Sequence, residues 1–146
     1  MKQIFTFAFF IFSVTSFAQT KAEATFDQKG YKFDNLTEGD TLSFYYYFTN
    51  TGGSDLVLKS VKPTCGCTIA DWPKYAIQPG QRDSIFVTFD TKDRVGYNAK
   101  GINIMSNVGE INLVFEAVVR DSKGNLFTEP EDEIEDKEED HSGHNH

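Results

Sequence analysis

The sequence predicts an all-β fold, an immunoglobulin-like antiparallel β-sandwich of about seven strands. Apolar and polar residues alternate with a period of two in several segments, and turn-forming residues separate these segments at short intervals. No segment shows a sustained helical period near 3.6 residues. Two such sheets would pack face to face and bury alternate side chains. A small β-barrel would give a similar pattern and is the alternative fold.

The first residues carry the features of a secretory signal. Lys2 supplies a positive charge, residues 4–14 are apolar, and Ser16-Phe17-Ala18 places small residues at a cleavage site. The apolar run is shorter than the ~20 residues that a membrane-spanning helix needs. We therefore expect residues 1–18 to be removed, with no membrane span left afterwards. Export predicts a periplasmic, envelope or extracellular protein in an oxidising compartment.

Charge divides the remaining chain into a domain, residues 19–128, and a tail, residues 129–146. The tail holds nine acidic residues and one lysine, and therefore accounts for the whole formal net charge of −8. Such a composition buries too little apolar surface to fold, so we expect a disordered tail. The rest of the chain has no basic stripe, which argues against nucleic-acid binding.

The first half of the domain gives three predicted strands. Residues 22–27 and 31–34 are short strand patterns, and residues 35–40 have turn chemistry. Residues 41–50 form the clearest strand, with Tyr45 and Tyr47 on its outer face. Its predicted core face consists of Leu42, Phe44, Tyr46 and Phe48.

The middle of the domain begins with a turn at residues 50–54. Residues 55–61 follow as a strand with Leu56 and Leu58 pointing inward. After the cysteines, Pro73 argues against a central strand, so residues 69–75 are expected to form a loop or a covered edge. Residues 78–81 contain a Pro-Gly turn.

The last part of the domain supplies three further strands. They cover residues 83–90, 97–106 and 110–120, and residues 107–109 form a tight hairpin turn between the last two. Residues 121–125 close the fold. The predicted core positions in these strands are Ile85, Val87, Phe89, Ile102, Ile104, Ile111, Leu113, Phe115, Ala117 and Val119.

Both cysteines lie in one short stretch, Cys65-Gly66-Cys67. In an extended segment both side chains point to the same side, with Cα atoms roughly 6–7 Å apart, the long end of the disulfide range. Three interpretations are open. The pair is structural, as a disulfide or as packed thiols; it is a soft-metal site for Cu(I) or Zn(II); or it is a redox dithiol, although it lacks the Cys-x-x-Cys spacing.

All three histidines of the chain, His141, His144 and His146, lie in the tail. Imidazoles at this spacing would bind copper or zinc loosely. The domain has no histidine, so nucleophile–histidine pairs are absent from it, and no phosphate loop or dinucleotide motif occurs. We therefore expect no catalysis and no cofactor beyond weak copper or zinc binding.

Residues 41–119 contain a set of motifs that resembles a known family, the bacterial exported domain of unknown function 1573. This family is similar to the Hydin-type and major-sperm-protein-type immunoglobulin-like domains. The resemblance implies the fold and an exported location, and it brings no established reaction, substrate or catalytic residue. The matching motifs are Asn50-Thr51-Gly52, Val61-Lys62-Pro63-Thr64-Cys65-Gly66-Cys67-Thr68, Pro79-Gly80, Phe89-Asp90-Thr91, Gly96 and Ser106-Asn107.

The sequence thus favours a non-catalytic, exported binding or structural module whose partner is another envelope protein. Binding would use a free sheet edge, which accepts an added strand, or the loop from Thr64 to Tyr75. The alternative is a periplasmic metal-handling or thiol-redox protein that uses Cys65 and Cys67. The residues proposed for the binding loop are Thr64, Gly66, Thr68, Trp72 and Tyr75.

Overall fold

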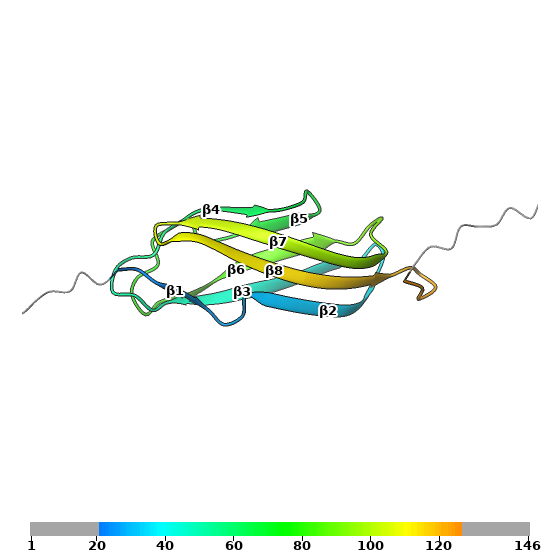
Figure 1. Cartoon of the computed structure of the whole chain (residues 1–146), viewed down its shortest axis with the longest axis horizontal. Coiled ribbons are helices and arrows are strands. Elements are labelled where there is room, and N and C mark those ends of the chain that lie inside the picture. The colour runs from blue at the N-terminus through cyan, green and yellow to red at the C-terminus, as the bar shows by residue number, and fades with distance from the viewer. Residues whose placement is uncertain (1–20, 127–146) are drawn as a thin grey trace, which may run out of the picture.

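The computed structural model describes residues 21–126, which form two four-stranded sheets packed face to face (Figure 1). The predicted β-sandwich is confirmed. The strands are β1 (Ala24–Phe26), β2 (Gly30–Thr37), β3 (Thr41–Asn50), β4 (Leu58–Pro63), β5 (Thr68–Asp71), β6 (Arg82–Asp90), β7 (Gly96–Ser106) and β8 (Gly109–Arg120). The predicted signal sequence, the acidic tail and its histidines lie outside the described residues.

One sheet is antiparallel and the other is mixed. Sheet A has the order β1-β3-β6-β5, and sheet B has the order β2-β8-β7-β4. In sheet B, β2 runs parallel to β8, whereas the other pairs are antiparallel. The prediction of about seven antiparallel strands is corrected to eight with one parallel pair. The chain passes from β1 to β2 through only three residues, and so changes sheets without forming a hairpin.

The core lies between the sheets and is built from the alternating residues that the sequence predicted. Phe115 of β8 is fully buried, and its ring meets Phe44 and Phe89 of the opposite sheet at centroid distances of 5.2 and 5.4 Å. Leu42, Phe44 and Ile111 are half-buried against this cluster. The fully buried predicted positions are Tyr46, Phe48, Leu56, Ile85, Val87, Phe89, Ile102, Ile104, Leu113, Phe115, Ala117 and Val119.

Strand β2 is longer than the sequence predicted. A turn was expected from residue 35, yet the strand continues to Thr37. Asn35 takes a positive φ of 65°, and the register with β8 shifts between Phe33 and Leu36. Asparagine tolerates this conformation, so its turn-like character here makes a β-bulge within a strand.

The neighbouring predictions are adjusted by a few residues. The strand predicted at 55–61 starts at Leu58 and runs to Pro63, while Leu56 forms an isolated bridge with Ile77. The segment predicted as a loop or covered edge contains β5, an edge strand of sheet A that ends before Pro73.

Asn50 joins three connections at one end of the sandwich. It is fully buried, and its side-chain nitrogen donates to the carbonyl oxygens of Ser54 and Ile77, both at 2.8 Å. Its side-chain oxygen accepts the backbone N–H groups of Gly52 at 3.0 Å and Glu23 at 3.3 Å. One side chain therefore holds the β3–β4 turn, the segment before β6 and the start of β1.

Residues 21–126 include no helix that is long and apolar enough to cross a bilayer.

Candidate functional site at the disulfide crossover

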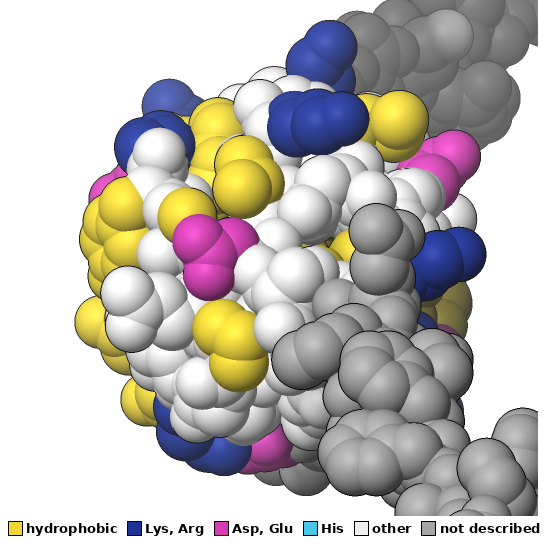
Figure 2. Space-filling view, turned by 90° about the vertical axis from the view of Figure 1, so that its left-hand side faces the viewer, with side chains coloured by type: hydrophobic (Ala, Val, Ile, Leu, Met, Phe, Trp, Pro, Cys, Tyr) yellow, Lys and Arg dark blue, Asp and Glu magenta, His cyan; other side chains and the backbone are white. Residues whose placement is uncertain are grey.

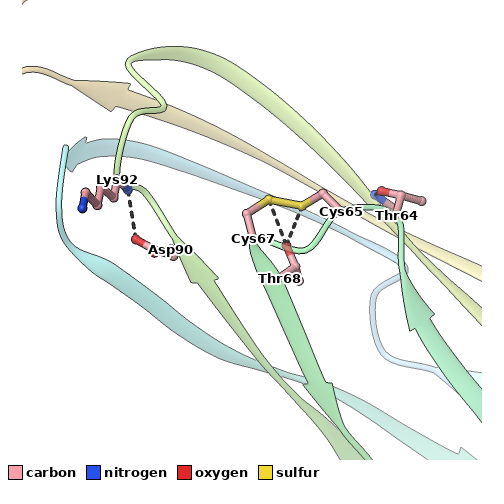
Figure 3. The surroundings of a disulfide bond; sticks show 7 residues. Thr64, Cys65, Cys67, Thr68, Asp90 and Lys92 are labelled. Carbon is pink, nitrogen blue, oxygen red and sulfur yellow. Dashed lines mark hydrogen bonds between the residues drawn. A yellow bond between two sulfur atoms is a disulfide. The ribbon is translucent and has the colours of Figure 1, made fainter.

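The two cysteines lie where the chain crosses from one sheet to the other (Figure 3). Residues 64–67 connect β4 of sheet B to β5 of sheet A, and Cys65 and Cys67 are joined by a disulfide. Their Cα atoms are 5.3 Å apart, closer than expected for an extended segment. The chain turns here, since the backbone N–H of Thr68 donates to the carbonyl oxygen of Cys65 at 3.3 Å.

Hydrogen bonds fasten the crossover to both sheets. The Thr64 N–H donates to the Gly101 carbonyl at 2.9 Å, and the Gly101 N–H donates to the Thr64 hydroxyl at 3.0 Å. On the other side, the Cys67 carbonyl accepts the Asp90 N–H at 2.9 Å. A Cβ at Gly101 would lie 3.1 Å from the Thr64 methyl group, so a glycine on β7 permits the close approach.

A buried hydroxyl lies beneath the disulfide. Thr68 is buried, and its Oγ1 lies 3.4 Å from the Cys65 sulfur and 3.9 Å from the Cys67 sulfur (Figure 3). Both cysteines are half-buried. Metal ligation or dithiol chemistry requires thiolates, and these sulfurs would supply them only after reduction. Residues 21–126 hold no group of three or more metal-ligating side chains.

We expect the disulfide to make a small contribution to global stability. It closes a loop of three residues, for which loop-closure entropy predicts about 1–2 kcal/mol. The Cys65→Ser, Cys67→Ser variant should therefore still unfold cooperatively, with a midpoint lowered by roughly 5–15 °C in calorimetry. A variant that does not fold would show that the disulfide holds the two sheets together. Gly66→Ala is the matched control, since a Cβ there meets no atom within 4 Å.

Beyond β5, Trp72 and Tyr75 lie in different environments. Trp72 packs partly against the core, and its indole N–H is buried without a hydrogen-bond partner among the described residues. The Lys74 ammonium lies over the Trp72 ring. Tyr75 is exposed, and its hydroxyl donates to a carboxylate oxygen of Asp83 at 2.6 Å. This hydrogen bond raises the pKa of Tyr75 above its ordinary value.

The predicted loop residues thus form two groups, one at each end of β5. Thr64, Gly66 and Thr68 surround the disulfide, whereas Trp72 and Tyr75 border a shallow hollow beyond the other end of the strand. The sequence did not single out Phe86 and Asp83, which also line the hollow. For Phe86 the signal in the sequence was its position on the outward side of the β6 alternation. Asp83 shares the inward parity of Ile85, so the alternation gave no signal for it. The residues around the hollow are Asp71, Trp72, Pro73, Tyr75, Asp83, Ser84 and Phe86.

Aromatic side chains continue from the hollow over the outer face of sheet A. The Tyr45 ring lies 4.9 Å from Phe86 and 5.8 Å from Tyr47, between ring centroids. Arg82 lies over the Tyr47 ring at 5.1 Å and forms a bidentate ion pair with Asp27. Hydrophobic side chains are also visible along one side of the end-on view in Figure 2.

The comparison with protein families decides the classification. The model of the family described as "Protein of unknown function (DUF1573)" matches residues 24–119. The chain belongs to the DUF1573 family. The match extends from the first residue of β1 to Val119 in β8, and therefore includes both sheets and the disulfide crossover. The family resemblance found in the sequence is confirmed.

Solved structures similar to this DUF1573 chain share its sandwich. PapD-like domain 7 of human CEP192 is 12% identical with a TM-score of 0.55, covering 68% of this chain and 86% of that one. A protein of unknown function from Porphyromonas gingivalis W83 is 19% identical with a TM-score of 0.56, covering 68% and 46%. The YadV chaperone is 10% identical with a TM-score of 0.52, covering 66% and 51%.

At these identities the similarity establishes the fold and nothing more specific. The DUF1573 chain spans about half the length of the Porphyromonas protein and of the YadV chaperone. No curated protein sequence matches it.

Proposed function

We propose that this chain is an exported, non-catalytic binding module of the cell envelope, and that its partner is another envelope protein. The observation that carries the proposal is the apolar surface along β5 and the loop after it. Ile69 is 69% exposed and Tyr75 is 57% exposed. Exposed aliphatic and aromatic side chains grouped on one surface are typical of protein interaction sites.

The surroundings of this surface suit a protein interface. The disulfide crossover fixes the start of β5, because it is hydrogen-bonded to both β6 and β7. Charged side chains, Asp71, Lys74 and Asp83, lie around the aromatic hollow. Exposed aromatic side chains bordered by charged ones on a fixed backbone are typical of protein interfaces.

The non-catalytic part of the proposal rests on side-chain chemistry. Between residues 21 and 126 the chain has no histidine, and both thiols are joined in a disulfide. A nucleophile activated by an imidazole base therefore has no components in this region. Export is supported by the signal-like residues 1–18 and by the disulfide, since disulfides persist in oxidising compartments.

Site-specific photo-cross-linking in the envelope of cells that produce the protein tests the proposal. A photoreactive amino acid at position 69 or 75 should give one discrete heavier adduct. The same amino acid at position 112 should give none, because Asn112 is exposed on the outer face of sheet B, away from β5. Equal adducts at all three positions, or none at positions 69 and 75, would contradict the proposed surface.

A metal or redox function of the cysteine pair is the alternative, and it requires opening of the disulfide. The Thr68 hydroxyl near both sulfurs would be a hydrogen-bond donor to a thiolate. Stoichiometric Cu(I) uptake by the reduced protein, lost in the Cys65→Ser, Cys67→Ser variant, would favour this alternative over a binding module.

A further inference from the structure

Strand β3 is much longer than the strand that pairs with its outer side. In sheet A, β1 pairs with Phe48, Thr49 and Asn50, and the Asp27 N–H then donates to the Tyr47 carbonyl. The rest of β3, residues 41–46, pairs with β6 on one side only. Within residues 21–126 no strand lies on its other side.

The register shows which backbone groups face this open edge. The Asn50 N–H donates to the Gln81 carbonyl, and the Asp40 carbonyl accepts the Thr91 N–H. The backbone groups of the even-numbered residues of β3 therefore point toward β6. Hydrogen-bonding direction alternates along an antiparallel strand. Thr41, Ser43 and Tyr45 therefore point their N–H and C=O groups outward, and these groups have no partner in the described part of the chain.

An apolar seam lies directly inside the edge. Phe44 is only half-buried, and its ring meets two half-buried rings of β2 in sheet B, Tyr31 at 5.5 Å and Phe33 at 4.7 Å. Leu36 and Leu42 are also half-buried against the core. A strand added beside β3 would cover this seam with the side chains on its inner face.

The other long edges of the sandwich carry features that discourage strand addition. On β2, the edge of sheet B, a bulge at Asn35 interrupts the strand, and Lys32 and Asp34 are charged. On β4, Lys59, Lys62 and Pro63 are residues that discourage strand addition. On β5 the Thr68 N–H bonds to Cys65, and the Trp72 N–H bonds to the Asp71 side chain. Ala70 is then the residue of β5 that offers both backbone groups outward. Residues 41–46 of β3 contain no charged residue and no proline.

The geometry points to β3 as the site of strand addition: residues 41–46 bind an extended segment of a partner polypeptide that continues the line of β1. Because β1 already pairs with the same edge of β3, the edge is shaped for an antiparallel strand. Alternate apolar side chains of the segment cover Phe33 and Phe44, and the side chains between them lie beside Tyr45 and Tyr47. This surface is separate from the one on β5 and does not depend on it.

The test uses a panel of nine-residue peptides in which Val, Ile, Phe or Tyr alternates with Thr. Amide hydrogen exchange is measured by NMR on the wild-type protein. A peptide that adds to β3 slows exchange of the Ser43 and Tyr45 amides and leaves Ala70 unchanged. Protection of Ala70 alone, or no protection by any peptide, would overturn the inference. Protection without peptide that rises with protein concentration would overturn it in favour of pairing between two copies.

Matched proline variants identify the edge independently. Ser43→Pro removes an outward N–H without removing a bond to β6, and Ala70→Pro does the same on β5. The first should weaken peptide binding by about tenfold, through the lost hydrogen bond and the bulk of the ring, and the second should leave it unchanged. Circular dichroism verifies folding of each variant. Equal binding by a folded Ser43→Pro variant would refute the site on β3. That result would leave the proposed surface on β5 standing, since cross-linking from position 69 tests it separately.

Discussion

Replacement of Phe115 by alanine is expected to lower the free energy of unfolding by about 3–5 kcal/mol. Phe115 is fully buried in β8, and its ring contacts aromatic rings of Phe44 and Phe89 from the facing sheet. The substitution removes buried apolar surface and leaves a cavity between β8, β3 and β6. The strands are held in their sheets and cannot move together to fill it. Domains of this size are stable by only about 5–15 kcal/mol, so the loss is a large fraction of the total.

Urea unfolding of Phe115→Ala and Val114→Ala measures this contribution. Val114 is the adjacent residue on the same strand, but it is 52% exposed on the outer face. Its substitution should cost less than about 1 kcal/mol. Similar losses for the two variants would mean that the sandwich interior does not contribute most of the stability.

Replacement of Asn50 by alanine is expected to destabilise the protein by about 2–4 kcal/mol through lost polar contacts. The change leaves the Gly52 and Glu23 N–H groups without their acceptor and the Ser54 carbonyl without its donor. It also removes one of the two hydrogen bonds to the Ile77 carbonyl, which still accepts the Leu56 N–H. Buried polar groups that lose their partners cost more than the hydrogen bond itself contributed. The damage should be confined to one end of the sandwich.

Hydrogen exchange locates the effect of Asn50→Ala. Amides of the turn at residues 51–54 should exchange faster than in the wild type, while those in the centres of β7 and β8 should follow global unfolding. Asn103→Ala is the control, since Asn103 is exposed on β7. An equally large loss of stability for Asn103→Ala would show that the buried network is not responsible.

Alternation of residue type was enough to predict most of the strands. The pattern at residues 41–50 gave β3 with the same boundaries, and β6, β7 and β8 begin within one residue of their predicted starts. These strands bury one face and expose the other, so their period of two is visible in the sequence. Strand β2 was cut short in the prediction because Asn35 reads as a turn, although it forms a bulge.

The candidate sites needed pairing information that the sequence does not carry. The spacing of Cys65 and Cys67 placed both sulfurs on one side, but the turn that brings their Cα atoms to 5.3 Å depends on hydrogen bonds to β6 and β7. Phe86 and Asp83 reach the hollow because β5 pairs with β6. The open edge of β3 exists because β1, which pairs with it on that side, is much shorter than β3.

The parallel pairing of β2 with β8 has a consequence for how this protein is made. It brings Gly30 beside Val114, so nearly the whole chain must be synthesised before the second sheet can close. Contacts between residues so distant in sequence slow folding and lengthen the time for which an incomplete sheet stays exposed.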